Sequence, residues 1–151
     1  PIVSLVDEPG FLIGPDAEKA GTILHGTEAV LATTESTVPW TTVMIRKSFG
    51  VAAAAHYGPD GYVIAWPSAE SGPLPLEGGV AVAFKKEISE AEDPEAKRKE
   101  LEEKMAKNQN PFPRAEAFSV HEIIDPRETR KYISLWAERI QSQLKASLMS
   151  R

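Results

Sequence analysis

The side chains in this sequence that we consider as candidates for chemistry are the three histidines, Ser48 near Gly50, and the adjacent carboxylates of Asp7 and Glu8. The histidines are His25, His56 and His121. None of them has a second histidine or a carboxylate at the spacing of a zinc ligand pair, and the one acidic neighbour, Glu122, would point away from His121. We therefore expect three separate structural or surface histidines and no metal site.

The serine and the carboxylates are also poorly placed for catalysis. Ser48 lies in RKSFG, two residues before Gly50, whereas a nucleophilic serine on a sharp turn is expected between glycines, as in G-x-S-x-G. The phosphate-binding patterns G-x-x-x-x-G-K-[ST] and G-x-G-x-x-G are absent. The pair Asp7-Glu8 could act as an acid and a base, but such a pair more often ends a strand and caps the loop that follows. Because the chain has no cysteine, a thiol nucleophile is excluded.

The main chain around Gly50 offers a different chemistry. In VMIRKSFGVAAAAHYG, a strand-like run that begins at Val43 ends at a bend and leads into a short, alanine-rich helix. The first N–H groups of a helix have no intrahelical partner, so they could hold an oxyanion without any reactive side chain. The alternative is that Gly50-Val51-Ala52 only packs a tight crossover, and the pattern alone favours this alternative.

The composition is that of an ordinary soluble domain. With 151 residues, of which 42% are hydrophobic, the chain can form one domain with a real core. Its 22 acidic and 17 basic residues form no concentrated basic face, so nucleic acid is not an expected partner. No apolar run approaches the roughly 20 residues of a membrane span, and no signal-peptide pattern is visible. We expect a cytoplasmic protein, or a mitochondrial matrix protein in a eukaryote, and, because Pro1 opens a strand-like run, a piece of a longer chain.

The first half of the chain predicts an α/β architecture. Apolar strands are expected at 2–6, 41–45 and 62–66. A helix from Pro15 to about Glu35 should separate the first two, and the alanine-rich helix should separate the last two. This alternation implies a mainly parallel sheet with helices packed on it. The residues of the first helix that suggest close packing on the sheet are the apolar Ile23, Val30 and Leu31 and the small Ala20, Gly21 and Gly26.

The second half is expected to be mostly helical. Val80, Phe84 and Ile88 recur every fourth residue, which predicts one helical stripe. Asp93 precedes a proline and begins a highly charged helix whose charges should face solvent.

The C-terminal part predicts a short edge strand at 120–124 and a final helix that begins at Asp125-Pro126. This helix carries an apolar stripe that should dock on the body or on another subunit: Tyr132, Trp136, Ile140, Leu144 and Leu148. The expected division is a sheet and helix core, a charged helix, and a C-terminal strand with a docking helix: 1–90, 91–110 and 111–151.

The run VDEPGFLIGPDAEKAGTILHGTEAVLATTESTVPWTTVMIRKSFGVA resembles the biotin-dependent acyl-CoA carboxyltransferases. These are the transferase subunits of propionyl-CoA, acetyl-CoA and methylcrotonyl-CoA carboxylases and of related decarboxylases. The matching pieces follow the family's order along nearly the whole chain: Asp7 with Pro9-Gly10-Phe11 and Gly14, His25-Gly26, Glu35 with Thr37-Val38-Pro39, Arg46-Lys47 before Gly50, AWPSAE at 65–70, Glu77-Gly78-Gly79, and IIDPRETRKYI at 123–133.

The resemblance implies a crotonase-like (ClpP/crotonase) ββα superhelix that occurs twice in a full subunit, with this chain as a C-terminal part of the second copy. This half would handle carboxybiotin, delivered by a biotin carboxyl carrier and its biotin carboxylase component. The first half of a partner subunit, in a homo-oligomer, would hold the acyl-CoA. This chain alone should therefore be inactive.

The resemblance also assigns a role to the bend. In the family, carboxybiotin releases CO2, and backbone amides after the RK bend hold the ureido oxygen of the biotin enolate. Those amides map to Val51 and Ala52. Substrate groups perform the proton transfer, so no acid, base or metal is implied. The positions implied to contact substrate are Gly10, Phe11, Gly14 and Gly50.

Two departures from the family leave other interpretations open. The family commonly has Gly-Gly at the bend, whereas here the β-branched Val51 follows the glycine and narrows the approach. Ala53 and Ala54 lack the larger or polar residues often found in the family, so the acyl-CoA cannot be named. One alternative is a non-catalytic assembly domain in which the oxyanion hole, formed by the backbone N–H groups after the bend, is degraded. Another is a crotonase-type hydratase or isomerase, which would need a carboxylate near the hole, where none occurs before Asp60.

Overall fold

The computed structural model describes residues 1–149, without the side chains of Glu77, Gln143 and Ser147, so the last two residues of the predicted 111–151 segment lie outside the described residues. Within this part, five strands form one sheet in which every pairing is parallel. The order is β1-β2-β3-β5, with β4 paired to β2: β1 (Ile2–Glu8), β2 (Trp40–Phe49), β3 (Tyr62–Ala65), β4 (Glu70–Gly72) and β5 (Glu122–Ile123). The expected α/β architecture with a parallel sheet is confirmed.

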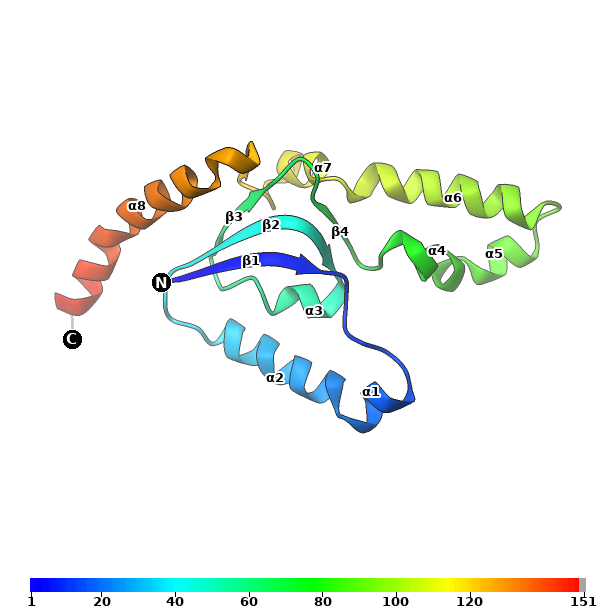
Figure 1. Cartoon of the computed structure of the whole chain (residues 1–151), viewed down its shortest axis with the longest axis horizontal. Coiled ribbons are helices and arrows are strands. Elements are labelled where there is room, and N and C mark those ends of the chain that lie inside the picture. Colours follow the sequence, from blue (N-terminus) through cyan, green and yellow to red (C-terminus); the bar gives the residue numbers. More distant parts are fainter. Residues whose placement is uncertain (150–151) are drawn as a thin grey trace.

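β2 is the central strand and has different partners along its length. Its first part, through Met44, lies between β1 and β3, and residues 47–49 pair with β4. Val6 lies opposite Met44 and Glu8 lies opposite Ser48, so β1 advances two residues where β2 advances four. Extra residues of this kind bend a strand. The end of β2 accordingly curves away from β3 and toward β4 (Figure 1).

Residues of β2 and β3 alternate between two apolar clusters, one on each face of the sheet. The first cluster comprises Met44, Val63, Ala65, Ala69 and Val120. In the second, Val43 and Ile64 meet Ile124, and Tyr132 and Ile133 pack against them from the C-terminal helix. Burial on both faces explains the apolar run Val43-Met44-Ile45 in β2 and the apolar sequence of β3.

The single helix expected from Pro15 to Glu35 is wrong, because the chain breaks there. α1 (Pro15–Lys19) ends and α2 (Thr22–Thr34) begins on either side of Gly21, whose φ of +73° lies in the left-handed region. α2 and α3 (Gly50–Ala54) lie on the same side of the sheet (Figure 1).

α2 turns small and polar residues toward the body instead of large apolar ones. Gly26 and Thr33 are buried, whereas Ile23 and Leu31 are exposed and Val30 is half-buried. The expectation that the apolar residues face the sheet is therefore wrong for Ile23 and Leu31. The space beside Gly26 is filled by the ring of Phe11, which leaves no room for a larger residue in the helix.

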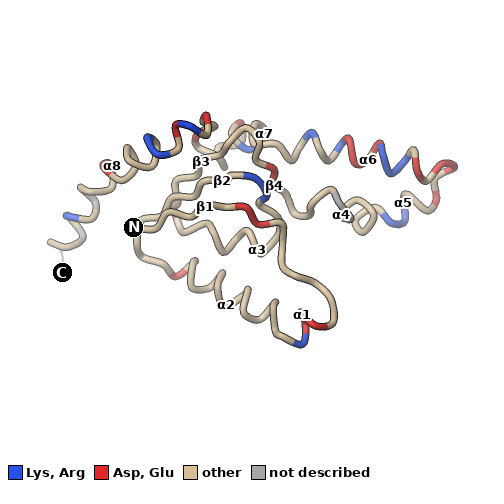
Figure 2. The backbone as a smooth tube through the Cα atoms, in the orientation of Figure 1, with Lys and Arg blue, Asp and Glu red and all other residues tan. Residues whose placement is uncertain are grey.

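The helices α4 (Leu76–Ala83), α5 (Lys85–Ser89) and α6 (Pro94–Gln109) form an arm that projects beyond the sheet (Figure 1). The expected single stripe is divided, because the chain leaves helical geometry at Phe84, with φ −116°. Val80 and Leu101 are buried in the arm. Asp93 caps α6 as expected, since its carboxylate accepts a hydrogen bond from the Ala96 N–H at 3.0 Å. Figure 2 shows both signs of charge interspersed along α6.

The C-terminal segment contains α7 (Pro111–Glu116), the 3-10 turn η1 (Pro126–Glu128) and α8 (Thr129–Met149). Asp125 caps η1, as the sequence predicts. Trp136 and Ile140 are each only 7% exposed, so docking of α8 on the body is confirmed for this part, whereas Leu148 is exposed. No helix in the described residues is long and apolar enough to cross a membrane.

Candidate functional site

The bend that follows β2 is built around Gly50. Phe49 is still extended, with φ −120° and ψ 141°, and Gly50 then takes a φ of +64° and begins α3. A side chain at residue 50 would be strained at this φ, and its Cβ would lie 3.4 Å from the carbonyl oxygen of Pro73. Glycine is therefore favoured by the backbone conformation, and the neighbouring loop leaves little spare room beside it.

The residues after Gly50 face in different directions. The side chain of Val51 is 63% exposed, whereas Ala52 and Ala53 are buried. Ala52 and Ala53 pack against the body, whereas Val51 is exposed at the bend. Val51 and Ala52 are the second and third residues of α3, and N–H groups at such positions have no partner within the helix.

Hydrogen bonds at the other end of α3 fix its direction. The hydroxyl of Thr33 donates to the carbonyl of Ala55 at 2.9 Å. The hydroxyl of Thr42 and the indole N–H of Trp40 both donate to the carbonyl of His56, at 2.7 and 2.9 Å. α2 and β2 thus hold α3 from two sides. Sequence reasoning missed these residues, because partners 14 to 22 positions apart leave no local pattern.

The loop after β1 lies at the same end of the sheet as the bend, because β1 and β2 are parallel. Gly10 and Gly14 have φ values of 127° and 113°, with open space around their α-carbons. Phe11, which was expected to contact substrate, packs its ring on Gly26 of α2. The side chains that this loop presents to solvent are Leu12 and Ile13, which the sequence analysis did not single out.

The two carboxylates that end β1 have structural partners. Asp7 forms a bidentate ion pair with Arg46, with an Nη2 to Oδ2 distance of 3.0 Å, and accepts the backbone N–H of Lys47 at 3.2 Å. The Arg46 guanidinium holds the pKa of Asp7 below its usual range. Glu8 accepts the backbone N–H of Gly10 at 2.9 Å. The prediction that this pair ends a strand and caps the following loop is confirmed.

The three histidines are separate, as expected. His56 Nδ1 lies 3.1 Å from the hydroxyl of Ser4, and His121 Nδ1 accepts the backbone N–H of Val63 at 3.0 Å. The third, His25, pairs with Glu28 on the surface of α2. Among the described residues, no three side chains of metal-ligand type are grouped.

Ser48 is not an exposed nucleophile. It is buried, and its hydroxyl shares a hydrogen bond of 2.7 Å with the hydroxyl of Tyr57. Burial raises the pKa of Tyr57, so this phenol stays neutral at ordinary pH. The pair links β2 to the segment after α3 and gives no sign of a hydrolase.

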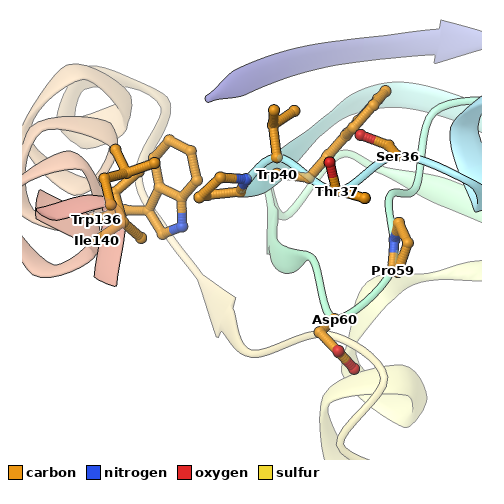
Figure 3. A pocket seen from close by; sticks show the side chains of 10 residues that line it. Ser36, Thr37, Trp40, Pro59, Asp60, Trp136 and Ile140 are labelled. Atoms are coloured by element: carbon orange, nitrogen blue, oxygen red, sulfur yellow. The ribbon is translucent and has the colours of Figure 1, made fainter. Parts of the chain in front are cut away.

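A hollow of about 610 Å³ lies at the opposite end of β2. α8 forms one wall and the segment leading into β2 forms another (Figure 3). It is lined by Ser36, Thr37, Val38, Pro39, Trp40, Pro59, Asp60, Trp136, Ile140 and Leu144. Trp40 begins β2 and Gly50 follows its end, so this hollow and the bend are at different ends of the sheet.

A family profile described as "Carboxyl transferase domain" matches residues 1–149. The chain belongs to this family. It is 42% identical over 138 residues to the methylmalonyl-CoA carboxyltransferase 12S subunit of Propionibacterium freudenreichii subsp. shermanii, covering 89% of the chain and 26% of that protein. It is 38% identical over 151 residues to the carboxyltransferase subunit of propionyl-CoA carboxylase of Haloferax mediterranei, covering 97% of the chain and 29% of that subunit.

Solved carboxyltransferase structures share the fold. The transcarboxylase 12S hexamer, crystallised with methylmalonyl-coenzyme A and methylmalonic acid, matches with a TM-score of 0.83 and 40% identity over 93% of this chain and 28% of that one. The β subunit of geranyl-CoA carboxylase from P. aeruginosa matches with a TM-score of 0.77 at 22% identity, over 90% of this chain and 27% of that one, which supports the fold alone. The expected family and the crotonase-like fold are both confirmed. The chain spans between a quarter and a third of the length of these relatives.

Proposed function

We propose that this chain is part of a carboxyltransferase subunit that moves a carboxyl group from carboxybiotin to the α-carbon of an acyl-CoA, and that it forms the biotin side of the active site. The bend at Gly50 carries this proposal. It places the first N–H groups of a helix at the carboxyl end of the central strand, in a chain of the carboxyl transferase family. This is the end of a parallel sheet at which ligands bind.

The proposed role of the bend is to hold negative charge. Carboxybiotin, when bound, would supply the carboxyl group as CO2 and leave negative charge on its ureido oxygen. The N–H groups of Val51 and Ala52 would donate hydrogen bonds to that oxygen. Since α3 is already fixed by α2 and β2, these donors need no rearrangement as the charge develops. α3 has only five residues, so the local N–H groups matter more than the helix dipole.

The side chains near the bend favour this role over a hydratase or isomerase. Such an enzyme needs a carboxylate that is available for proton transfer beside the hole. Asp7 and Glu8, the two carboxylates that end β1, are instead engaged with Arg46, Lys47 and Gly10. The proposal asks no proton transfer of either group.

We also propose that the acyl-CoA is held by a second crotonase-like half, supplied by a partner subunit in a homo-oligomer, and that biotin arrives on a carrier protein. The transcarboxylase 12S protein forms a hexamer with methylmalonyl-coenzyme A bound, and this chain matches 28% of it. At the loop and the bend, Leu12, Ile13 and Val51 expose apolar side chains that suit contact with a partner or an apolar ring.

The sharpest test removes one N–H group and keeps the side chain, with a weaker acceptor at the preceding carbonyl as the one further change. A proline at residue 52 would enlarge a buried side chain, so an ester is preferable. Lactic acid in place of Ala52, introduced by nonsense suppression in the full-length subunit, keeps the methyl group and replaces the N–H by oxygen. Loss of one oxyanion donor typically costs about 10²–10³ in rate. We expect a fall of this size in biotin-dependent malonyl-CoA decarboxylation.

The matched control is lactic acid in place of Ala54. This residue ends α3, and its N–H is available for bonding within the helix, so the same chemical change should alter the rate much less. If the rate falls equally for the substitutions at residues 52 and 54, the oxyanion role is rejected. The alternative, that the bend only packs a tight crossover, would then replace it. Water addition to an enoyl-CoA by the unmodified subunit would point to a hydratase instead, and the absence of any acyl-CoA chemistry would point to an assembly domain.

A further inference from the structure

We propose that Asp7 and Glu8 are two independent positioning residues, of which Asp7 sets the direction of the Gly50 bend and Glu8 sets the position of the loop at residues 9–14. This inference rests on the proposed function, because it assigns the bend and the loop to one active site. It also makes structural predictions that hold without catalysis.

The pairing between β1 and β2 is irregular around Asp7. From Val6 to Glu8, β1 advances two residues, whereas the facing part of β2 advances four, from Met44 to Ser48. The extra residues of β2 leave the regular ladder, and their N–H groups need other acceptors. Asp7 is the residue of β1 that lies opposite this gap.

The carboxylate of Asp7 occupies the gap. Its Oδ1 accepts the backbone N–H of Lys47 at 3.2 Å, and both of its oxygens accept Nε–H of Arg46 at 3.1 Å. Figure 2 shows the acidic end of β1 beside the basic end of β2. One side chain of β1 thus binds a main-chain and a side-chain group of β2, and such charge-assisted bidentate bonds fix geometry.

The contacts of Asp7 come just before the bend. Residues 47–49 pair with β4 on one side, Ser48 still lies opposite Glu8 of β1 on the other, and Gly50 follows directly. The path of these three residues therefore decides where the N–H groups of Val51 and Ala52 point. Because Asp7 holds the first of the three, its loss should misdirect the bend without removing any group from it.

Glu8 acts on a different segment. Successive residues of a strand face opposite sides, so Glu8 cannot share the position of Asp7. Its carboxylate accepts the N–H of Gly10 at 2.9 Å, and the next residue, Phe11, packs on Gly26 of α2. These two contacts hold the start of the segment that presents Leu12 and Ile13 to solvent.

The test compares Asp7→Ala and Glu8→Ala in the full-length subunit, with kcat and KM measured for malonyl-CoA decarboxylation with free biotin as the acceptor of the carboxyl group. A misplacement of about 1 Å can cost about 100-fold in rate. We expect Asp7→Ala to lower kcat by about 10- to 100-fold with little change in KM for biotin. Glu8→Ala should raise KM for biotin several-fold with little change in kcat, because it loosens a binding wall.

The conservative variants separate positioning from general damage. Asp7→Asn and Glu8→Gln each keep a carbonyl oxygen that can accept the backbone N–H, so each should recover part of the loss and should fold normally. Hydrogen exchange measured by mass spectrometry supplies a readout independent of activity. Exchange should rise at residues 45–52 in the Asp7 variants and at residues 9–14 in the Glu8 variants.

The outcomes are distinct. If both alanine variants change kcat and KM alike, or if exchange rises equally in both segments, the two residues are not independent and the inference is wrong. If the unmodified subunit shows no biotin-dependent reaction, the proposed function fails. Segment-specific exchange would then still support the two positioning roles, and its absence would reject them.

Discussion

The two ends of β2 differ in how they are built. At its carboxyl end, the backbone is shaped by Gly50 and tied by polar contacts such as that between Asp7 and Arg46. At its amino end, apolar side chains such as Trp136 and Ile140 border a hollow of about 610 Å³. Under the proposed function the chemistry takes place at the bend and not in the hollow, because an oxyanion needs directed donors and not a large space.

The largest effect on activity is expected from Gly50→Ala in the full-length subunit. Alanine at φ +64° costs about 1–2 kcal/mol and would push its methyl toward the carbonyl oxygen of Pro73. The bend should shift, and biotin-dependent decarboxylation should fall about 100-fold or more. The measurement is kcat at saturating substrate, with circular dichroism to confirm folding. A folded Gly50→Ala variant with normal kcat would mean that the carboxyl end of β2 is no more important for activity than its amino end.

At the amino end of β2, a substitution should change the stability of the protein and not its activity. Trp136 is 7% exposed on the hollow, and truncation of a buried tryptophan typically costs about 3–5 kcal/mol. Trp136→Ala should lower the free energy of unfolding by about this amount, measured by denaturant titration, while the folded fraction keeps its kcat. Trp136→Phe is the control and should lose much less. A loss of kcat per folded molecule would instead connect the hollow to the chemistry.

A smaller effect is expected at Val51. Its exposed, β-branched side chain borders the bend and restricts approach to the N–H groups. Val51→Gly should lower KM for biotin several-fold and cost about 0.5–1 kcal/mol of stability, because glycine weakens a helix. Steady-state kinetics measure the KM for biotin, and thermal melting measures the change in stability. An unchanged KM would mean that Val51 does not narrow the site.

The smallest effect concerns pH. The folded-state pKa of Asp7 is lowered, so its contribution to stability is present above the ordinary carboxyl pKa and is lost as the pH falls through the folded value. The ion pair is partly exposed, so this contribution should stay below about 1 kcal/mol. The difference in melting temperature between the native subunit and Asp7→Asn should be largest near neutral pH and vanish in strong acid. A difference that stays constant with pH would contradict the role of the ion pair.

Features that depend on local pattern could be predicted from the sequence. The apolar runs predicted the parallel strands, and proline beside aspartate predicted the helix starts at Asp93 and Asp125. The glycine after a strand predicted the bend at Gly50. The chain's membership of the carboxyl transferase family was recognisable from motifs spread along its whole length.

Features that depend on distant partners could not be predicted. Ile23 and Leu31 look like core residues in a helical pattern, yet both are exposed, and only the expected burial of the small residue Gly26 is confirmed. Phe11 fills the space beside Gly26, a contact between residues 15 positions apart that no periodicity encodes. The irregular pairing opposite Asp7 likewise arises only when two strands are aligned.

The pairing of β3 with β5 has a consequence for how the molecule folds. Val63 and His121 hydrogen-bond across 58 residues of chain, and β5 itself is only two residues long. A contact this distant must overcome a large loop-closure entropy before it contributes stability, so it forms late. During synthesis, Val63 and Ile64 therefore remain without Val120 and Ile124 until the C-terminal segment has left the ribosome. The nascent sheet depends on the segment from Val120 onward to close, and truncation before Val120 should produce aggregation rather than a shorter folded protein.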